Sequence, residues 1–363
     1  MIPRWKIERE FETFKQQLQA LPERLIGPAR QRRLDARFPA DYRVLNGAAA
    51  RTPKVAIFLI YQPRGMAGSV LATCQHLARH GYAVMLVANS PVSAQDQQTL
   101  GPYVWRFVER PNFGYDFGGY RDGIRLLWHW SVSPEQLIIL NDSVWFPLAQ
   151  NESMIDAMEA SSAGFLGALR YVEPGQPEGE HAGIFLSYFF LLKRPVLTAD
   201  VFLDYWNRYV STSNKYLTVR RGERGFSRTL FAAQVPSEGI YSRERMLALL
   251  ATQGDDALAK TLDYGAYTDG NLQRESEELL RASPRDAAWR ERVMAHIGAA
   301  SARRNFHSTF CYATIGLMGV PLLKKNRGEL QVRMRRQYVR AVLAGDLPRP
   351  DEATFAEIRA SVD

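Results

Sequence analysis

The sequence predicts an α/β protein built on a mostly parallel sheet flanked by helices. Short apolar segments alternate with helical patterns through the first half of the chain, as in parallel strands joined by right-handed crossovers. Residues 137–140 are apolar on both pleat faces, as a strand covered on both sides must be. Asn141, Asp142 and Ser143 follow directly. Ligands of open α/β sheets bind outside the carboxyl ends of the strands, so we expect a ligand there.

The elements can be placed in chain order. Residues 5–20 are predicted to be helical, and the Pro-, Arg- and Ala-rich residues 22–52 favour a connecting arm. The sheet strands are predicted over residues 55–61, 83–88, 104–108 and 137–140. A helix over 69–80, ended by Gly81, joins the first two strands. Asn89 stands at the carboxyl end of the second strand.

The loop after the third strand reads R-P-N-F-G-Y-D-F-G-G-Y-R-D-G over residues 110–123. Gly114, Gly118 and Gly119 lack a Cβ, so the backbone can turn sharply or approach a ligand closely. Polar groups in the same span are Asn112, Asp116, Arg121 and Asp122. The alternative is a tight turn that only introduces the following helix. The tandem of this loop with the N-D-S strand end favours a binding site.

The second half of the chain is more mixed. Its predicted elements are a strand at 164–170, a loop at 171–181, a core strand at 185–192, a helix at 201–209 and another near 227, and helices within 253–300. We expect three regions: an N-terminal helix and arm over 1–52, a catalytic domain over 53–250, and a helical region over 251–363 that completes the site.

Several segments resemble the rhamnan synthesis F family, whose members are rhamnosyltransferase-like enzymes of bacterial cell-surface polysaccharide assembly. The specific ones are N-F-G-Y-D-F-G-G-Y-R at 112–121 and L-N-D-S-V-W-F-P-L at 140–148. Weaker ones are V-A-I-F-L-I-Y-Q-P-R at 55–64, S-Y-F-F-L-L-K-R at 187–194, E-R-G-F-S at 223–227, N-F-H-S-T-F at 305–310 and G-V-P-L-L-K-K at 319–325. The resemblance spans roughly residues 54–330.

The resemblance implies a GT-A-like (Rossmann-like) fold and a glycosyltransferase. It would move a sugar, rhamnose by family implication, from a nucleotide-sugar donor to a lipid-linked or growing cell-surface polysaccharide or lipopolysaccharide acceptor. We predict that the donor site is formed by Tyr61, Gln62, Asn89, Asn112, Gly114, Asp116, Arg121, Asn141, Ser143, His307 and Lys324. Gln62 stands where the family more usually has an acidic residue, which bears on nucleobase selection.

A divalent metal is an open question. Many GT-A enzymes place Asp-x-Asp at this strand end, whereas the matching residues are Asn141, Asp142 and Ser143. Carboxylates are the usual ligands of hard cations. We therefore expect Mg²⁺ or Mn²⁺ to be weakly bound or absent, with Asp142 as the metal ligand and Asp116 as its only nearby support. Asn141 and Ser143 have local turn capping as the alternative role.

The general base is assigned to Glu223, with His181 as the second candidate and Asp142 as the third catalytic residue. A carboxylate at this position is also a common helix cap, so both roles of Glu223 stay open. Ile184 stands where the family's usual histidine does, so His181 does not simply inherit that role. His307 either faces the diphosphate or is a structural histidine.

Composition limits the class of protein. The chain has 363 residues, 46% of them hydrophobic, and two cysteines, which excludes a disulfide framework. The sequence has no apolar signal core and no run of about 18 apolar residues, so we expect a cytoplasmic protein. The net charge of +8 is concentrated at residues 321–340, the basic segment. It suits an anionic membrane surface or the nucleotide diphosphate, with a solvated helix face as the alternative. No nucleic-acid-binding motif accompanies it.

Two other functions remain open. One is a non-catalytic GT-A-like subunit of a polysaccharide-assembly complex, which the missing Asp-x-Asp carboxylates support. The other is a Rossmann-like oxidoreductase. It is the weaker of the two, because residues 63–68 after the first strand do not fit G-x-G-x-x-G.

Overall fold

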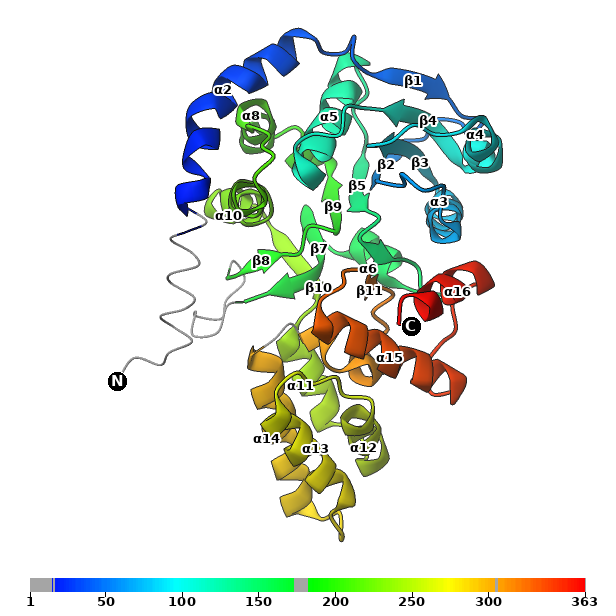
Figure 1. Cartoon of the computed structure of the whole chain (residues 1–363), viewed down its shortest axis with the longest axis vertical. Coiled ribbons are helices and arrows are strands. Elements are labelled where there is room, and N and C mark those ends of the chain that lie inside the picture. The colour runs from blue at the N-terminus through cyan, green and yellow to red at the C-terminus, as the bar shows by residue number, and fades with distance from the viewer. Residues whose placement is uncertain (1–14, 16, 173–181, 304–305, 363) are drawn as a thin grey trace.

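The computed structural model describes residue 15 and residues 17–172, 182–303 and 306–362. Among these residues, a large sheet occupies one half of the molecule and a group of helices the other (Figure 1). The strands are β1 (Arg43–Asn46), β2 (Lys54–Ile60), β3 (Tyr82–Ala88), β4 (Val104–Glu109), β5 (Gln136–Asn141), β7 (Phe165–Tyr171), β8 (Ile184–Phe185), β9 (Phe189–Lys193) and β10 (Ser237–Tyr241). The predicted strands of the first half are thus confirmed to within a residue or two.

The strands follow the order β1-β4-β3-β2-β5-β9-β7-β10, and β8 pairs with β7. β4, β3, β2 and β5 are parallel, whereas β9 is antiparallel to both β5 and β7. The predicted class, a mostly parallel sheet flanked by helices, is confirmed. If the strands of this sheet from β2 to β9 are numbered along the chain, leaving out β6 and β8, the core order is 3-2-1-4-6-5, and the sixth strand is reversed. The dinucleotide-binding Rossmann order is 3-2-1-4-5-6, so this topology argues against the oxidoreductase alternative.

Residues 185–192 were expected to form one strand and instead form two. A turn at residues 186–188 separates β8, which pairs with β7, from β9, which lies between β5 and β7. The apolar side chains run on through this turn, because Leu186 and Tyr188 are buried as the strand residues are. The break between β8 and β9 therefore cannot be recognised from the hydrophobicity of the sequence.

The pleat of β2 divides the core into two sides. Ala56, Phe58 and Ile60 pack in one apolar cluster with residues of α3 (Gly68–Arg79) and α6 (Met154–Ala160). Val55, Ile57 and Leu59 pack in the other, with α5 (Tyr115–His129), α8 (Asp200–Arg208) and α10 (Arg224–Ala232). Alternate residues of a strand point to opposite faces, so a strand covered on both faces must be apolar throughout.

The N-terminal arm expected at 22–52 is wrong in part, because it contains a helix, α2 (Leu21–Ala36), as well as β1. Pro22 suits the first turn of a helix, where its missing N–H costs nothing. Tertiary contacts hold the rest: Arg121 and Arg125 pair with Asp35, and Gln31 accepts the backbone N–H of Ser211 at 2.8 Å. Most of the helix predicted at 5–20 lies outside the described residues.

The C-terminal region has two parts. The first is a helical group of α11 (Arg243–Ala251), α12 (Asp255–Asp263), α13 (Gly270–Arg281) and α14 (Ala287–Arg303), in the lower half of Figure 1. The second is β11 (Leu323–Lys324), α15 (Glu329–Leu343) and α16 (Glu352–Ala360). β11 pairs with β6 (Val144–Trp145), which follows β5 directly. The chain therefore returns to the carboxyl end of the sheet. Within the described residues, no helix combines the length and apolarity needed to cross a bilayer.

Candidate functional site

The candidate site lies at the carboxyl ends of β2 and β5. These strands are neighbours, and the chain leaves β2 for β3 on one side and enters β5 on the other, which is a topological switch point where open sheets bind ligands. The Asp142 carboxylate joins the two strand ends. Its Oδ2 accepts the backbone N–H of Tyr61 at 2.9 Å and the Nε2 of Gln62 at 2.6 Å. Tyr61 itself is exposed.

Asn141 and Ser143 face each other. The Oδ1 of Asn141 accepts the backbone N–H and the hydroxyl of Ser143, at 3.1 and 2.5 Å. Its Nδ2 donates to the hydroxyl of Tyr120 at 2.8 Å, and that hydroxyl donates to the carbonyl of Ser187 at 2.8 Å. Asn141 therefore ties β5 to α5 and to the segment before β9. This geometry agrees with the turn-capping alternative.

The glycine loop brings Asp116 to the same edge. Gly114 has a φ of 88°, and a Cβ there would lie 2.9 Å from the Cβ of Ser211, so this position requires glycine. The helix α5 starts at the next residue and carries Asp116 in its first turn. Gly118 and Gly119 serve packing, because a Cβ on Gly119 would come within 2.4 Å of Leu59. Of the three glycines, Gly114 is thus the one that shapes the loop.

Asp116 is a carboxylate with a strongly displaced pKa. Burial, together with the charges of Asp142 and Glu223, raises its pKa to about 6 against the opposing charge of Lys324. Within the described residues, its carboxylate has no hydrogen-bond partner. An unpaired carboxylate that titrates near neutral pH is suited to accept a proton.

Glu223 lies at the end of a π-helical turn (Val219–Glu223) that leads into α10. Its Oε1 accepts the backbone N–H of Ser187 at 3.2 Å, and it forms no side-chain cap on α10. The helix-cap alternative is therefore wrong. Burial raises the pKa of Glu223, while the Ser187 N–H and the charges of Lys324 and Arg224 lower it. The carboxylates of Glu223 and Asp116 are coupled electrostatically, because each interacts with the charge of Lys324.

Two adjacent lysines supply the positive charge. The Nζ of Lys324 is 3.4 Å from the hydroxyl of Ser143 and 4.0 Å from the centre of the Tyr188 ring. The Nζ of Lys325 donates to the Ser69 hydroxyl at 3.0 Å. Burial raises the pKa of Asp142, and the charge of Lys325 opposes that rise. Both lysines come from β11 and the residue after it. The β6–β11 pairing therefore sets them beside the N-D-S strand end.

His307 contacts Tyr188 and interacts with the charge of Lys324. Its Nε2 is 3.2 Å from the Tyr188 hydroxyl, and its Nδ1 is buried without a partner in the described residues. Burial and the charge of Lys324 lower its pKa to about 3, so the ring is neutral at physiological pH. His307 therefore brings no positive charge to a diphosphate.

Some predicted residues are not brought to this group. Arg121 is wrong as a donor-site residue, because its buried guanidinium pairs with Asp35 at 2.8 Å and donates to the carbonyl of Trp206. The Asn89 side chain accepts from Arg110 at 2.5 Å. Asn112 is exposed on the loop. His181 lies outside the described residues.

Sequence reasoning missed two members of the group. Lys325 was assigned to the basic segment and to a family motif but not to the site, and Tyr188 only to a family motif. The adjacency of two lysines after an apolar strand was the available signal for Lys325. Tyr188 had no such signal, because a buried tyrosine beside a strand is most often a packing residue.

The residues do not fit a metal held by the protein. Asn141 and Ser143 bond to each other, Asp142 accepts two N–H groups, and a lysine amine stands 3.4 Å from Ser143. In the described residues, the cluster with three potential ligand atoms within 4.8 Å of one another is a different one.

Comparison with known proteins bears on the family. Residues 84–239 match the sequence model of the rhamnan synthesis protein F family. This match confirms the predicted resemblance to that family over these residues. The matched segment runs from β3 to β10 and includes the glycine loop, the N-D-S strand end and Glu223.

Similar whole chains are also known. A protein of Sinorhizobium fredii strain NGR234 named uncharacterized protein y4gN is 29% identical over 342 residues, or 93% of this chain and 88% of its own. A glycosyltransferase involved in glycosylation of the major capsid of PBCV-1 aligns with 53% of this chain and 84% of its own, at 11% identity and a TM-score of 0.29. A mannosyltransferase of Pyrobaculum calidifontis, solved with GDP-Man and Mn²⁺, aligns with 90% of this chain and 97% of its own. Its sequence identity to this chain is 11% and its TM-score is 0.30. We base the fold on the sheet topology described above.

Proposed function

We propose that this protein is a GT-A-like glycosyltransferase that moves a sugar from a nucleotide-sugar donor to a growing cell-surface polysaccharide or lipopolysaccharide acceptor. The description of the family suggests rhamnose as the sugar. The observation that carries the proposal is the charge arrangement at the switch point. Asp116, Asp142 and Glu223 interact with the paired lysines Lys324 and Lys325 at the edge where an open sheet binds its ligand.

The lysines would bind the diphosphate. Sugar transfer leaves negative charge on the nucleoside diphosphate, and ammonium groups held in place stabilise that charge without a metal. Burial lowers the pKa of Lys324, and Glu223 and Asp116 raise it back. The carboxylates therefore keep the lysine charged in a partly dry site. This arrangement supports a reaction that needs no protein-bound Mg²⁺ or Mn²⁺.

Asp142 would hold the donor side of the site. It fixes the backbone of Tyr61 and the side chain of Gln62 through its Oδ2. Gln62 also donates its backbone N–H to the Ser90 hydroxyl at 3.3 Å, so the ends of β2 and β3 are joined there. An exposed Tyr61 above these bonds offers a ring face for a nucleobase.

Glu223 would be the general base that takes the proton of the acceptor hydroxyl, and Asp116 is the second candidate. Two observations favour keeping Asp116 in this role beside Glu223: its unpaired carboxylate and its pKa of about 6. The base must be ionised to act. Transfer by either carboxylate should therefore fall as the pH drops through its raised pKa.

The basic residues of segment 321–340 have different surroundings, so only some of them can contribute to the expected membrane surface. Lys324 and Lys325 belong to the site, and Arg335 is 1% exposed and donates to the carbonyls of Lys324 and Asn326. Arg336 remains exposed, and Arg333 pairs with Glu329 at 2.9 Å on the surface of α15. Peripheral association with an anionic membrane, if it occurs, rests on these exposed arginines.

A donor panel tests the function. Unfolding temperature is measured with a set of nucleotide sugars, each with and without added Mg²⁺ or Mn²⁺, because a ligand of the folded state stabilises it. The donor that stabilises is then assayed for transfer to a lipid-linked acceptor. Stabilisation with transfer supports the enzyme. Stabilisation without hydrolysis or transfer, across all acceptors tried, favours the non-catalytic subunit. No stabilisation by any nucleotide sugar contradicts the proposal.

A further inference from the structure

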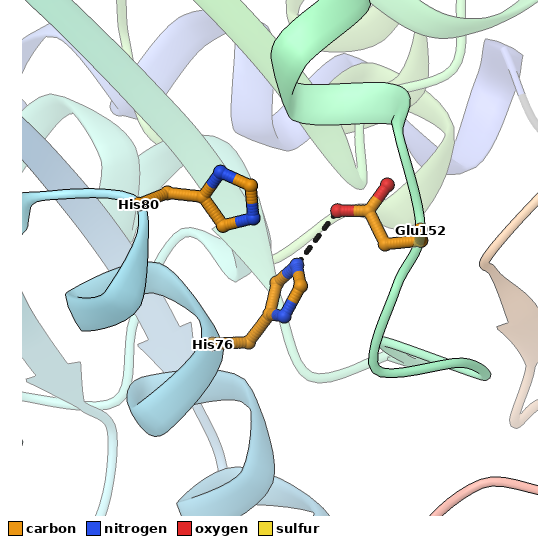
Figure 2. A group of neighbouring side chains, drawn as sticks. All are labelled: His76, His80 and Glu152. Atoms are coloured by element: carbon orange, nitrogen blue, oxygen red, sulfur yellow. Dashed lines mark hydrogen bonds and ion pairs between the residues drawn. The ribbon is translucent and has the colours of Figure 1, made fainter.

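A second cluster of polar side chains lies at the far end of α3. His76 lies in the last turn of α3 and His80, four residues later, is the C-cap of the helix, so both rings project from the same side of the helix end. Glu152, from the segment before α6, faces them (Figure 2). One potential ligand atom from each residue lies within 4.8 Å of the other two. His76 is 1% exposed and Glu152 is 9% exposed, so the cluster is largely dry.

We propose that His76, His80 and Glu152 form a structural zinc site that joins α3 to the segment leading into α6. Two imidazole nitrogens and one carboxylate oxygen are a common ligand set for Zn²⁺, and a water or a fourth side chain completes a tetrahedron. Each donor would lie about 2 Å from the metal and about 3.3 Å from its neighbours. The Nε2 of His76 and the Oε1 of Glu152 are already 2.6 Å apart.

The surroundings of His80 favour metal binding. Its Nδ1 is 3.3 Å from the Oδ1 of Asp156 on α6. A carboxylate that accepts the Nδ1–H fixes the tautomer that leaves the Nε2 lone pair free, which is the usual outer partner of a metal-bound histidine.

Glu152 is also held in place. Its Oε2 accepts the backbone N–H of Met154, at the start of α6, and its Oε1 faces His76. The carboxylate is thus oriented by the helix that follows it. Without a metal, its negative charge is compensated only by N–H donors in a largely dry environment, which is costly. A divalent cation would remove that cost.

Arg79 is the one contact that opposes the metal. Its Nη2 is 3.3 Å from the Nδ1 of His76, which implies a proton on Nε2 in the metal-free form. Zinc on Nε2 requires that proton to move to Nδ1, where an arginine cannot accept it. Arg79 is exposed, and its Nη2 also donates to the side chain of Gln150. Arg79→Gln should therefore tighten zinc binding, because glutamine offers an acceptor for the Nδ1–H.

This site is separate from the proposed transferase site. Ser69, which Lys325 contacts, lies near the start of α3, and His76 and His80 follow it by seven and eleven residues. At 1.5 Å per helical residue, these separations are about 10 and 16 Å along the axis. The zinc would therefore act on stability and would not contact the sugar donor. The inference stands whether or not the transferase proposal does.

Metal analysis of the untagged full-length protein tests the site. Protein dialysed against Zn²⁺ and then gel-filtered should hold about one equivalent, and Co²⁺ should give the intense d–d absorption of a tetrahedral complex. His80→Gln should weaken Zn²⁺ binding by at least about tenfold, a typical cost of losing a ligand or its support. His129→Gln, which changes an exposed histidine at the end of α5, is the matched control and should bind as the parent does.

A folding defect is separated from a binding defect by two further measurements. Far-UV circular dichroism reports whether His80→Gln is folded, and Glu152→Gln provides a second variant that keeps the acceptor for Met154. The unfolding temperature of the parent should rise with Zn²⁺ concentration, and that of the two ligand variants should not. Less than a tenth of an equivalent in the parent, or equal zinc in parent and folded His80→Gln, overturns the proposal.

Discussion

The backbone N–H of Tyr61 donates to the carboxylate of Asp142 across 2.9 Å, and this bond connects the carboxyl ends of β2 and β5. Eighty-one residues separate the two partners. The same carboxylate oxygen also accepts Gln62. Asp142 is therefore both a charge of the candidate site and the support of its first loop.

Asp142→Ala should weaken donor binding and abolish measurable transfer while the protein stays folded. The change leaves the Tyr61 N–H and the Gln62 amide without their acceptor, and removing such a partner costs about 1–3 kcal/mol. That corresponds to roughly 5- to 150-fold in donor affinity. Calorimetric titration of a confirmed donor measures it. Full transfer activity in the variant would remove Asp142 from the mechanism.

Replacing either site lysine should weaken nucleoside diphosphate binding. A hydrogen bond to a charged group contributes about 1.5–3 kcal/mol, so Lys324→Met or Lys325→Met should lose about 10- to 150-fold in affinity. The salt dependence of binding should also become shallower. Lys260→Met is the control, because Lys260 lies on α12, outside the candidate site, and is paired with Asp346. Equal affinities in all three variants would contradict a diphosphate site at β11.

Glu223→Gln should reduce turnover by about 10²- to 10⁴-fold, the usual loss when a general base is removed. Donor affinity should change little, because glutamine still accepts the Ser187 N–H. Asp116→Asn is the companion variant. The pH profile of turnover distinguishes the two, since the base must be ionised. If the acidic limb near pH 6 persists in Glu223→Gln and turnover is within threefold, the base is Asp116.

Asp116→Asn should stabilise the fold at neutral pH. A carboxyl whose folded pKa of about 6 exceeds its reference value of 3.8 binds protons more tightly when folded. The free energy of unfolding therefore falls as the pH rises through this interval, and asparagine avoids the loss. One pKa unit corresponds to 1.36 kcal/mol, which sets an upper limit of roughly 3 kcal/mol. Denaturant unfolding at pH 4 and 8 should show the gain only at pH 8.

Membrane association, if present, should depend on the exposed arginines of α15. Each basic residue near an anionic surface contributes about 1 kcal/mol, so Arg333→Gln with Arg336→Gln should reduce co-sedimentation with anionic vesicles. Arg274→Gln with Arg281→Gln, on α13, is the matched control. Arg335 is left unchanged, because its loss would free the carbonyls of Lys324 and Asn326. Equal binding to neutral and anionic vesicles would argue against this role.

The strands around the site were predictable from the sequence because each is an apolar run followed by polar residues. The placement of Asn141, Asp142 and Asp116 at one edge followed from the rule that parallel strands share a carboxyl edge. α2 was not predictable, because its stability comes from partners such as Arg121 and Ser211, which lie far away in the chain. Propensity alone is a weak guide to such helices.

The long-range parts of the site were beyond the sequence. The sequence alone does not distinguish the basic residues at 321–340 from one another. Only the fold shows that Lys325 belongs to the site and that Arg335 is buried. The spacing of His76 and His80 was visible, but Glu152 stands 76 residues from His76 and nothing in the sequence links them. Chemistry that depends on pairs distant in sequence requires the folded chain.

The pairing of β11 with β6 has a consequence for biosynthesis. The sheet and the three acidic side chains leave the ribosome before residues 323–325 are synthesised, so the nascent domain holds these carboxylates without the two lysines that later counter their charge. The last part of the chain then supplies the two ammonium groups, and Glu357 of α16 accepts the backbone N–H and hydroxyl of Ser69. Donor binding should therefore be the final property that the growing polypeptide acquires, and a chain stopped before Leu323 should fold its sheet yet ignore nucleotide sugars.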